Sequence, residues 1–190
     1  MGGGSVWMLL FLMASVMAGC GKEGEPEYRM DERGSLRSRA DPSRNRLWVL
    51  GLDDVRVYDT RDKKLIRRIS LPSWSVAGFT CMPDIALDRA GSAFISSNAQ
   101  SRLWRVDAGS FEVKEYEISL LGKERWDIGF GALAITADGT LFAVTSSANS
   151  LWKIDIAGAS ASLVELYHPP VKACAFTAQF VERLERSGKP

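Results

Sequence analysis

The sequence has few of the residues that build most active sites. It contains one histidine, His168, and three cysteines, which leaves little imidazole or thiol chemistry available. It has no CxxC pair, no CxxCH haem motif, no Walker loop and no HExxH helix. These absences exclude the common zinc, haem and nucleotide-phosphate sites. We therefore predict no catalytic residues, no metal ligands and no cofactor.

The chain also lacks a strong excess of either charge. Its 24 Lys and Arg and 23 Asp and Glu leave a net charge of +1, so no nucleic-acid partner is predicted. A hydrophobic fraction of 46% in 190 residues is that of one globular domain. Residues 61–68 (RDKKLIRR) are locally basic. We interpret them as a solvated outer strand, because Lys and Arg at a sheet edge discourage strand addition.

No apolar run reaches the length of about 20 residues that spans a membrane. The longest, residues 6–18, is followed by Gly19 and Cys20. A short apolar run ending in small residues is typical of a signal peptide, predicted here for residues 1–19. The end of this run resembles a bacterial lipobox. That resemblance implies acylation of Cys20 and a lipid-anchored protein on the periplasmic side of the cell envelope, with the outer membrane favoured over the inner.

Because of two departures from the lipobox pattern, other kinds of export signal remain alternatives. Met17 stands where Leu is usual, and the first seven residues carry no Lys or Arg. An ordinary cleaved signal or an uncleaved anchor would explain the same run. Residues 20–39 follow, charged and poor in large apolar side chains, and this composition predicts a flexible tether.

Two segments of the chain match each other without a gap. Residues 84–107 (DIALDRAGSAFISSNAQSRLWRVD) align with residues 132–155 (ALAITADGTLFAVTSSANSLWKID) at an offset of 48, with six identities. A third, less regular copy is seen in residues 40–59, where Asn45 takes the place of the turn glycines Gly91 and Gly139. Each copy predicts four short strands separated by turns, which is the pattern of a propeller blade.

These segments resemble NHL-type and SMP-30/gluconolactonase-type propeller repeats, and residues 40–51 (ADPSRNRLWVLG) resemble a YVTN-type repeat. The resemblance implies an all-β, partial β-propeller of about three blades over residues 40–172. Propellers have four to eight blades. A truncated propeller is therefore one alternative, and an open arc completed by a second copy in a homodimer is another.

Residues 173–190 carry apolar side chains at helical spacing, from Ala173 to Leu184. We expect an amphipathic helix that covers the open face of the last blade, since repeat arrays need a polar-faced cap. The rival interpretation is the linker into a fourth blade.

Four tryptophans divide into two groups. Trp104 and Trp152 occupy the same repeat position and are expected to pack between blades. Trp74 and Trp126 lie between repeats, where propeller ligands often bind, and are the candidate ligand surface. Cys81 and Cys174 lie in related segments of the exported part, so a disulfide between them is one option.

Two sets of residues indicate whether the chain could bind a metal. Asp59, Asp107 and Asp155 each end a third strand, which indicates turn hydrogen bonds. In gluconolactonase-type relatives, blade residues hold a divalent metal. The matching positions here are Pro83, Ser97, Gly131 and Thr145. These are poor ligands for a hard cation.

The sequence therefore favours a non-catalytic binding or scaffold protein, with an unknown protein or small molecule as partner. A metal-dependent hydrolase of the SMP-30/gluconolactonase type is the alternative.

Overall fold

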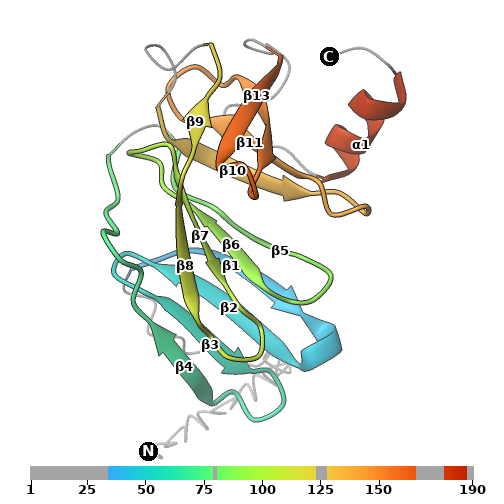
Figure 1. The fold of residues 1–190 in the computed structure, drawn as a ribbon. Coiled ribbons are helices and arrows are strands. Elements are labelled where there is room, and N and C mark those ends of the chain that lie inside the picture. The colour runs from blue at the N-terminus through green and yellow to red at the C-terminus, as the bar shows by residue number, and fades with distance from the viewer. Residues whose placement is uncertain (1–33, 79–80, 123–127, 166–177, 188–190) are drawn as a thin grey trace, which may run out of the picture.

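The computed structural model describes residues 34–78, 81–122, 128–165 and 178–187, and shows three antiparallel blades followed by a helix (Figure 1). Blade A consists of β1 (Ser35–Asp41), β2 (Arg46–Gly51), β3 (Val55–Asp59) and β4 (Leu65–Ile69), with a 3-10 turn at Pro42–Arg44. Blade B consists of β5 (Ile85–Leu87), β6 (Ala93–Ser96), β7 (Arg102–Val106) and β8 (Val113–Glu117). Blade C consists of β10 (Phe130–Ile135), β11 (Leu141–Thr145), β12 (Leu151–Asp155) and β13 (Ser160–Glu165). The short β9 (Ser119–Leu120) pairs in parallel with β13, and α1 spans Ala178–Ser187. The predicted all-β fold of three four-stranded blades is confirmed.

Local sequence explains the turns of the blades. Between the first two strands, Asn45, Gly91 and Gly139 all have positive φ, at 52°, 79° and 92°. This is the conformation that Asn and Gly tolerate best.

The carboxylates that end the third strands also act locally. Asp59, Asp107 and Asp155 each accept a hydrogen bond from the backbone amide two residues later, at 2.8, 2.8 and 3.0 Å. This is the expected turn chemistry.

The first blade is more complete than its sequence indicated. β1 begins at Ser35, so residues 35–39 of the predicted tether belong to the inner strand of blade A. The prediction failed because this strand is polar. Its two arginines, Arg37 and Arg39, are compensated by Asp84 of blade B, at 3.9 and 2.9 Å.

Apolar clusters join neighbouring blades. Trp104 lies between blades A and B with Trp48, Leu50 and Ile85. Trp152 lies in the matching cluster between blades B and C. Both indoles are at most 1% exposed, so the tryptophans of the repeat are packing residues.

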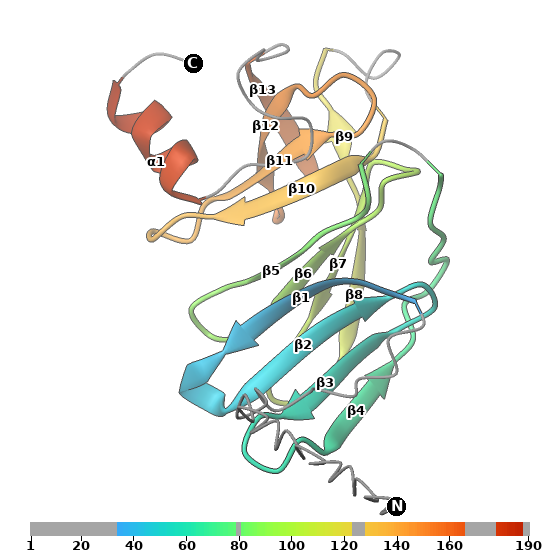
Figure 2. The same ribbon diagram turned by 180° about the vertical axis from the view of Figure 1, so that it is seen from behind.

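The helix α1 covers the other face of blade C, as expected. Val181 is 1% exposed and packs with Phe142, Val144 and Leu151. Ala178 and Leu184 border the same cluster. Figure 2 shows α1 beside β10, on the side away from blade B.

Among the described residues, none of the helical segments is long and apolar enough to cross a membrane.

Candidate functional site

The inner strands of the three blades surround a cleft. β5 lies between β1 and β10 and contacts both. The cleft has a volume of about 500 Å³, within the range of small-molecule sites, roughly 300–1,000 Å³. It is lined by residues of all three blades and of α1: Arg39, Ala40, Ala86, Leu87, Leu133, Ala134, Ile135 and Ala178. Figure 2 shows β5 between β1 and β10, the three strands that carry most of these residues. We refer to this cleft as the axial cleft.

Asp84 organises one end of the axial cleft. Its side chain is 8% exposed. One carboxylate oxygen accepts hydrogen bonds from Nη2 of Arg39 (2.9 Å) and from the amide of Ile85 (2.8 Å). The other oxygen accepts a hydrogen bond from the amide of Leu133 (3.1 Å), which lies in blade C. One buried carboxylate therefore ties all three blades together at the cleft.

The walls and the charge of the cleft determine what it can bind. Apart from Arg39, every lining side chain is aliphatic. Arg37 and Arg39 share the single carboxylate of Asp84, and their side chains are 38% and 41% exposed. A guanidinium has five N–H donors, so it can bond to a ligand in addition to Asp84. The cleft is suited to an apolar molecule with an anionic or hydrogen-bond-accepting end. None of its lining side chains is a nucleophile or an acid–base group.

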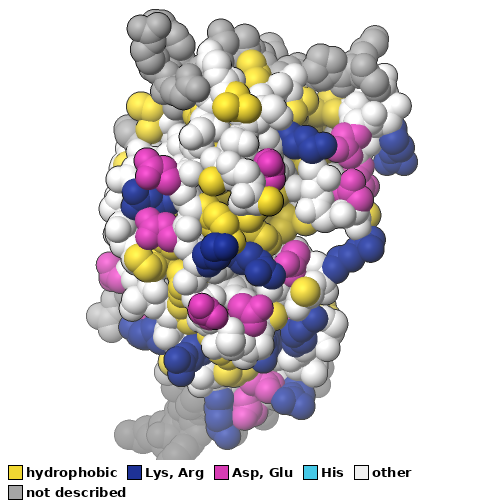
Figure 3. Space-filling model, in the orientation of Figure 1, with side chains coloured by type: hydrophobic (Ala, Val, Ile, Leu, Met, Phe, Trp, Pro, Cys, Tyr) yellow, Lys and Arg dark blue, Asp and Glu magenta, His cyan; other side chains and the backbone are white. Residues whose placement is uncertain are grey.

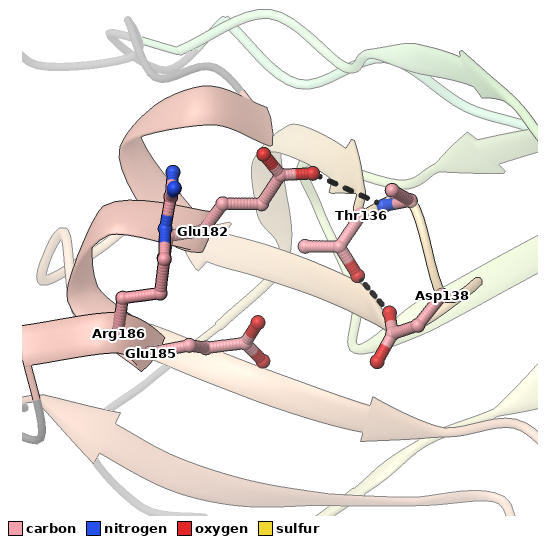
Figure 4. A pocket seen from close by; sticks show the side chains of 6 residues that line it. Thr136, Asp138, Glu182, Glu185 and Arg186 are labelled. Atoms are coloured by element: carbon pink, nitrogen blue, oxygen red, sulfur yellow. Dashed lines mark hydrogen bonds between the residues drawn. The ribbon is translucent and has the colours of Figure 1, made fainter.

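A second pocket of about 400 Å³ lies between α1 and the turn that joins β10 to β11 (Figure 4). Its lining residues are Thr136, Ala137, Asp138, Glu182, Glu185 and Arg186. Glu182 accepts a hydrogen bond from the amide of Ala137 at 3.2 Å, which holds the helix to blade C. A hydrogen bond from the hydroxyl of Thr136, with smaller contributions from Thr140, lowers the pKa of Asp138 to about 2. This pocket lies where α1 is attached to blade C.

Of the predicted site residues, only Trp74 and Cys81 fall within the described part of the chain, and neither lines the axial cleft. Trp74 packs edge-on against Trp104, with ring centroids 5.2 Å apart, and its ring nitrogen donates to the carbonyl of Leu52 at 2.7 Å. Trp126, His168 and Cys20 lie outside the described residues.

The structure describes one of the two cysteines of the possible Cys81–Cys174 disulfide. Cys81 is buried and disulfide-bonded. Cys174, its predicted partner, lies outside the described residues, so the pairing stays a prediction. The loop around Cys81 is held by Asn98, whose side-chain amide donates to the carbonyls of Ala77 (2.8 Å) and Cys81 (3.0 Å).

Three of the positions that match metal ligands of gluconolactonase-type proteins have local structural roles here. The hydroxyl of Ser97 accepts a hydrogen bond from the backbone amide of Gln100 at 3.1 Å. The hydroxyl of Thr145 accepts one from the backbone amide of Ser150, also at 3.1 Å. A Cβ on Gly131 would come within 2.2 Å of the Cβ of Cys81, so this glycine allows a close backbone approach. Within the described part of the chain, no group of three or more His, Cys, Asp or Glu side chains could hold a metal ion.

Sequence comparisons find no match to a known protein family and none to the curated proteins. Solved structures do match. One is virginiamycin B lyase from Staphylococcus aureus, with a TM-score of 0.53 and 15% identity over 74% of this chain and 43% of the lyase. Another is the Kuenenia stuttgartiensis hydrazine synthase, with a TM-score of 0.51 and 26% identity over 70% of this chain and 37% of that one.

The fold is that of part of a β-propeller. The chain spans less than half the length of either of these structures.

Sequence reasoning missed the axial cleft itself. Its lining residues come from segments as distant as Arg39 and Ala178, and each looks like an ordinary strand or helix residue. One signal was available. Asp84 stands where the other repeat has Ala132, and an acidic residue at the start of a buried strand needs a partner.

Proposed function

We propose that this protein is a non-catalytic binding protein of the cell envelope, anchored by a lipid on Cys20, which holds its ligand in the axial cleft. The observation that carries the binding part is the cleft itself, with aliphatic walls and the guanidinium of Arg39 at one end. The anchor is supported by residues 6–18 and the Ala18-Gly19-Cys20 sequence that follows them. A lipid-anchored protein of this kind acts at the periplasmic side of the membrane, with the outer membrane as the favoured site.

The partner in this proposal is a small apolar molecule or a protein segment that fits the same space. Rigid propeller frames carry many unrelated functions, so the fold alone does not choose between them. The chemistry of the cleft does limit the choice. A ligand must fill about 500 Å³ and present an acceptor group to Arg39.

The first experiment asks whether the axial cleft binds an apolar anion. The probe is 1-anilinonaphthalene-8-sulfonate, whose fluorescence rises in apolar sites. Ala40→Trp, on the exposed end of β1, fills the cleft and should abolish the rise. Ser38→Trp is the matched control, because Ser38 is exposed two residues away on the same strand and does not line the cleft. Equal fluorescence from both variants would contradict the proposal.

A chelator distinguishes this function from a metal-dependent hydrolase. A protein that binds its ligand without metal should keep its melting temperature when divalent ions are removed. A clear fall in the melting temperature with EDTA, reversed by one divalent metal, would favour the hydrolase, since a metal bound only to the native state adds stability.

A second candidate arrangement is an arc completed by another copy of the chain. It is favoured by the small share of the matched structures that the chain spans. Sedimentation, which gives the size, combined with a thermal melt tests it. A sharp melt of a protein of dimer size would place the ligand on the shared axis of two arcs. A sharp melt at monomer size would leave the axial cleft of one chain as the site. A broad melt with aggregation would indicate a propeller fragment.

A further inference from the structure

The outer strands of blades A and B differ in charge, although the whole chain is nearly neutral. Residues 61–68, at the outer edge of blade A, carry five Lys or Arg and one Asp, whereas residues 112–117, at the outer edge of blade B, carry three Glu and one Lys. In Figure 3 many of the Lys and Arg side chains lie over blade A, in the lower part of the molecule. We call residues 61–68 the basic edge.

The basic edge also exposes large apolar side chains. Leu65 and Ile66 are 46% and 41% exposed, and four of the five residues of β4 are exposed. β4 pairs with β3 on one side, and no described strand pairs with its other side. Basic residues interleaved with exposed aliphatic ones are the composition of surfaces that lie on anionic membranes.

Neighbouring carboxylates neutralise part of this charge. Arg61 pairs with Asp59 at 2.6 Å, Lys64 with Asp62 at 3.3 Å, and Arg68 with Asp54 at 2.9 Å. Residues 61–68 themselves carry five cations and one carboxylate, so the basic edge keeps an excess of positive charge. The pairs of Arg61 and Lys64 are solvent-exposed, and exposed ion pairs exchange readily for other anions.

The tether brings the basic edge close to a membrane. The chain enters blade A at Gly34, whose carbonyl accepts a hydrogen bond from the amide of Leu52 at 2.8 Å. Fourteen residues, 21–34, separate Cys20 from β1. Fully extended they reach at most about 50 Å. Blade A is therefore the first described part of the chain after the proposed anchor, and a tether of this length allows it to reach the membrane.

We infer that the basic edge rests on anionic lipid headgroups, with Lys64 and Arg67 at phosphates and Leu65 and Ile66 at the boundary of the acyl chains. In this position β4 of blade A lies against the membrane. The inference goes beyond ligand binding and rests on the proposed anchor only for the proximity of the membrane.

Hydrogen exchange of the full chain tests the inference. The protein is purified from membranes and reconstituted in vesicles of phosphatidylcholine alone or mixed with phosphatidylglycerol. Exchange of the β4 amides should slow about fivefold or more in the anionic vesicles, since each Lys or Arg gains roughly that factor at such a surface. The effect should vanish in 1 M salt, where charges are screened beyond about 3 Å. The amides of β8 should not change.

Charge reversal supplies the matched variants. Lys64→Glu with Arg67→Glu should abolish the protection of β4. Lys114→Glu, in the outer strand of blade B, should leave it intact. Both proteins should melt as the wild type does, because all three side chains are exposed or lie at an edge. Protection of β4 that survives Lys64→Glu with Arg67→Glu would overturn the inference.

Two further outcomes would also overturn it. The first is equal exchange of β4 in neutral and anionic vesicles. The second is protection by soluble polyglutamate but not by vesicles, which would assign the basic edge to an acidic protein. The mass of the N-terminal peptide reports acylation of Cys20 separately. An acylated chain with an unprotected edge contradicts this inference alone, and a protected edge on a chain without acyl groups contradicts the anchor alone.

Discussion

The two outer faces of the arc are completed in different ways. On blade C, the face turned away from blade B buries Phe142 and Leu151 beneath Val181 of α1. On blade A, the face turned away from blade B carries Val49, Asp54 and Arg56, with the carboxylate and guanidinium 3.2 Å apart. The helix α1 covers the first face, whereas the second face, as far as the chain is described, carries the ion pair of Asp54 and Arg56.

The repeat alignment makes this contrast sharper. Arg56 stands 48 residues before Trp104 and 96 before Trp152, at the same position of the third strand. The two tryptophans pack against the preceding blade. In blade A, the residue at this position pairs with Asp54. The strands of a blade follow from the repeat, but the side chain on each face follows from what lies against that face.

The largest effect is expected where a blade packs on its predecessor. Trp152→Ala should lower the free energy of unfolding by about 3–5 kcal/mol, because it empties a large space in the cluster between blades B and C. Urea unfolding measures it. Lys153→Ala, exposed on the same strand, is the control and should change stability by less than about 0.5 kcal/mol. Similar losses in both variants would remove the distinction between the two positions.

The ion pair of blade A should respond to the loss of its carboxylate. Asp54→Ala leaves the guanidinium of Arg56, 6% exposed, without this partner, and should cost about 3 kcal/mol of unfolding free energy. Asp62→Ala removes the exposed partner of Lys64 and should cost at most about 1 kcal/mol. If Asp54→Ala were as mild as Asp62→Ala, the ion pair would not be what stabilises this face.

The helix that covers blade C should be the weaker of the two ends. Val181→Ala removes two methyl groups from the cluster under α1 and should cost about 1–2 kcal/mol. Hydrogen exchange should become faster in α1 and not in blade A. Arg183→Ala, on the exposed face of the helix, serves as the control. An equal acceleration in blade A would show that the helix supports the whole arc.

The smallest effect concerns the turn next to α1. The pKa of Asp138, about 2, lies below the usual value for aspartate of about 3.9. The ionised carboxylate therefore stabilises the fold above about pH 4, and this contribution is lost as the pH falls toward 2. Thr136→Val removes the main hydrogen bond and should raise the pKa of Asp138 toward 3.9, measured by NMR titration. Thr140→Val should raise it less, and the reverse order would contradict the assigned cause.

The blades could be predicted from the sequence because their signals are local. The strands Val55–Asp59, Ile85–Leu87 and Ala93–Ser96 coincide with short apolar runs that end near turn residues. The positive φ of Asn45 was equally visible, because two glycines share its repeat position. The helix α1 also follows from spacing alone.

The features that could not be predicted depend on contacts between residues far apart in the sequence. β1 contains Arg37 and Arg39, which look like tether residues until Asp84, 45 residues after Arg39, is placed beside them. The axial cleft is lined by residues of four elements, β1, β5, β10 and α1, which are far apart in the sequence. No local pattern contains these contacts.

The parallel strand β9 has a consequence for the order in which the protein comes apart. It continues the chain from blade B and pairs with β13, with Ser119 opposite Ser160 and Leu120 opposite Ala161. Blades B and C thus share backbone hydrogen bonds, whereas blade A meets blade B through side-chain packing and the ion pairs of Asp84. Cooperative units of this kind open separately. The N-terminal blade can open while the other two remain folded, so among the three blades the first separation is expected between blades A and B.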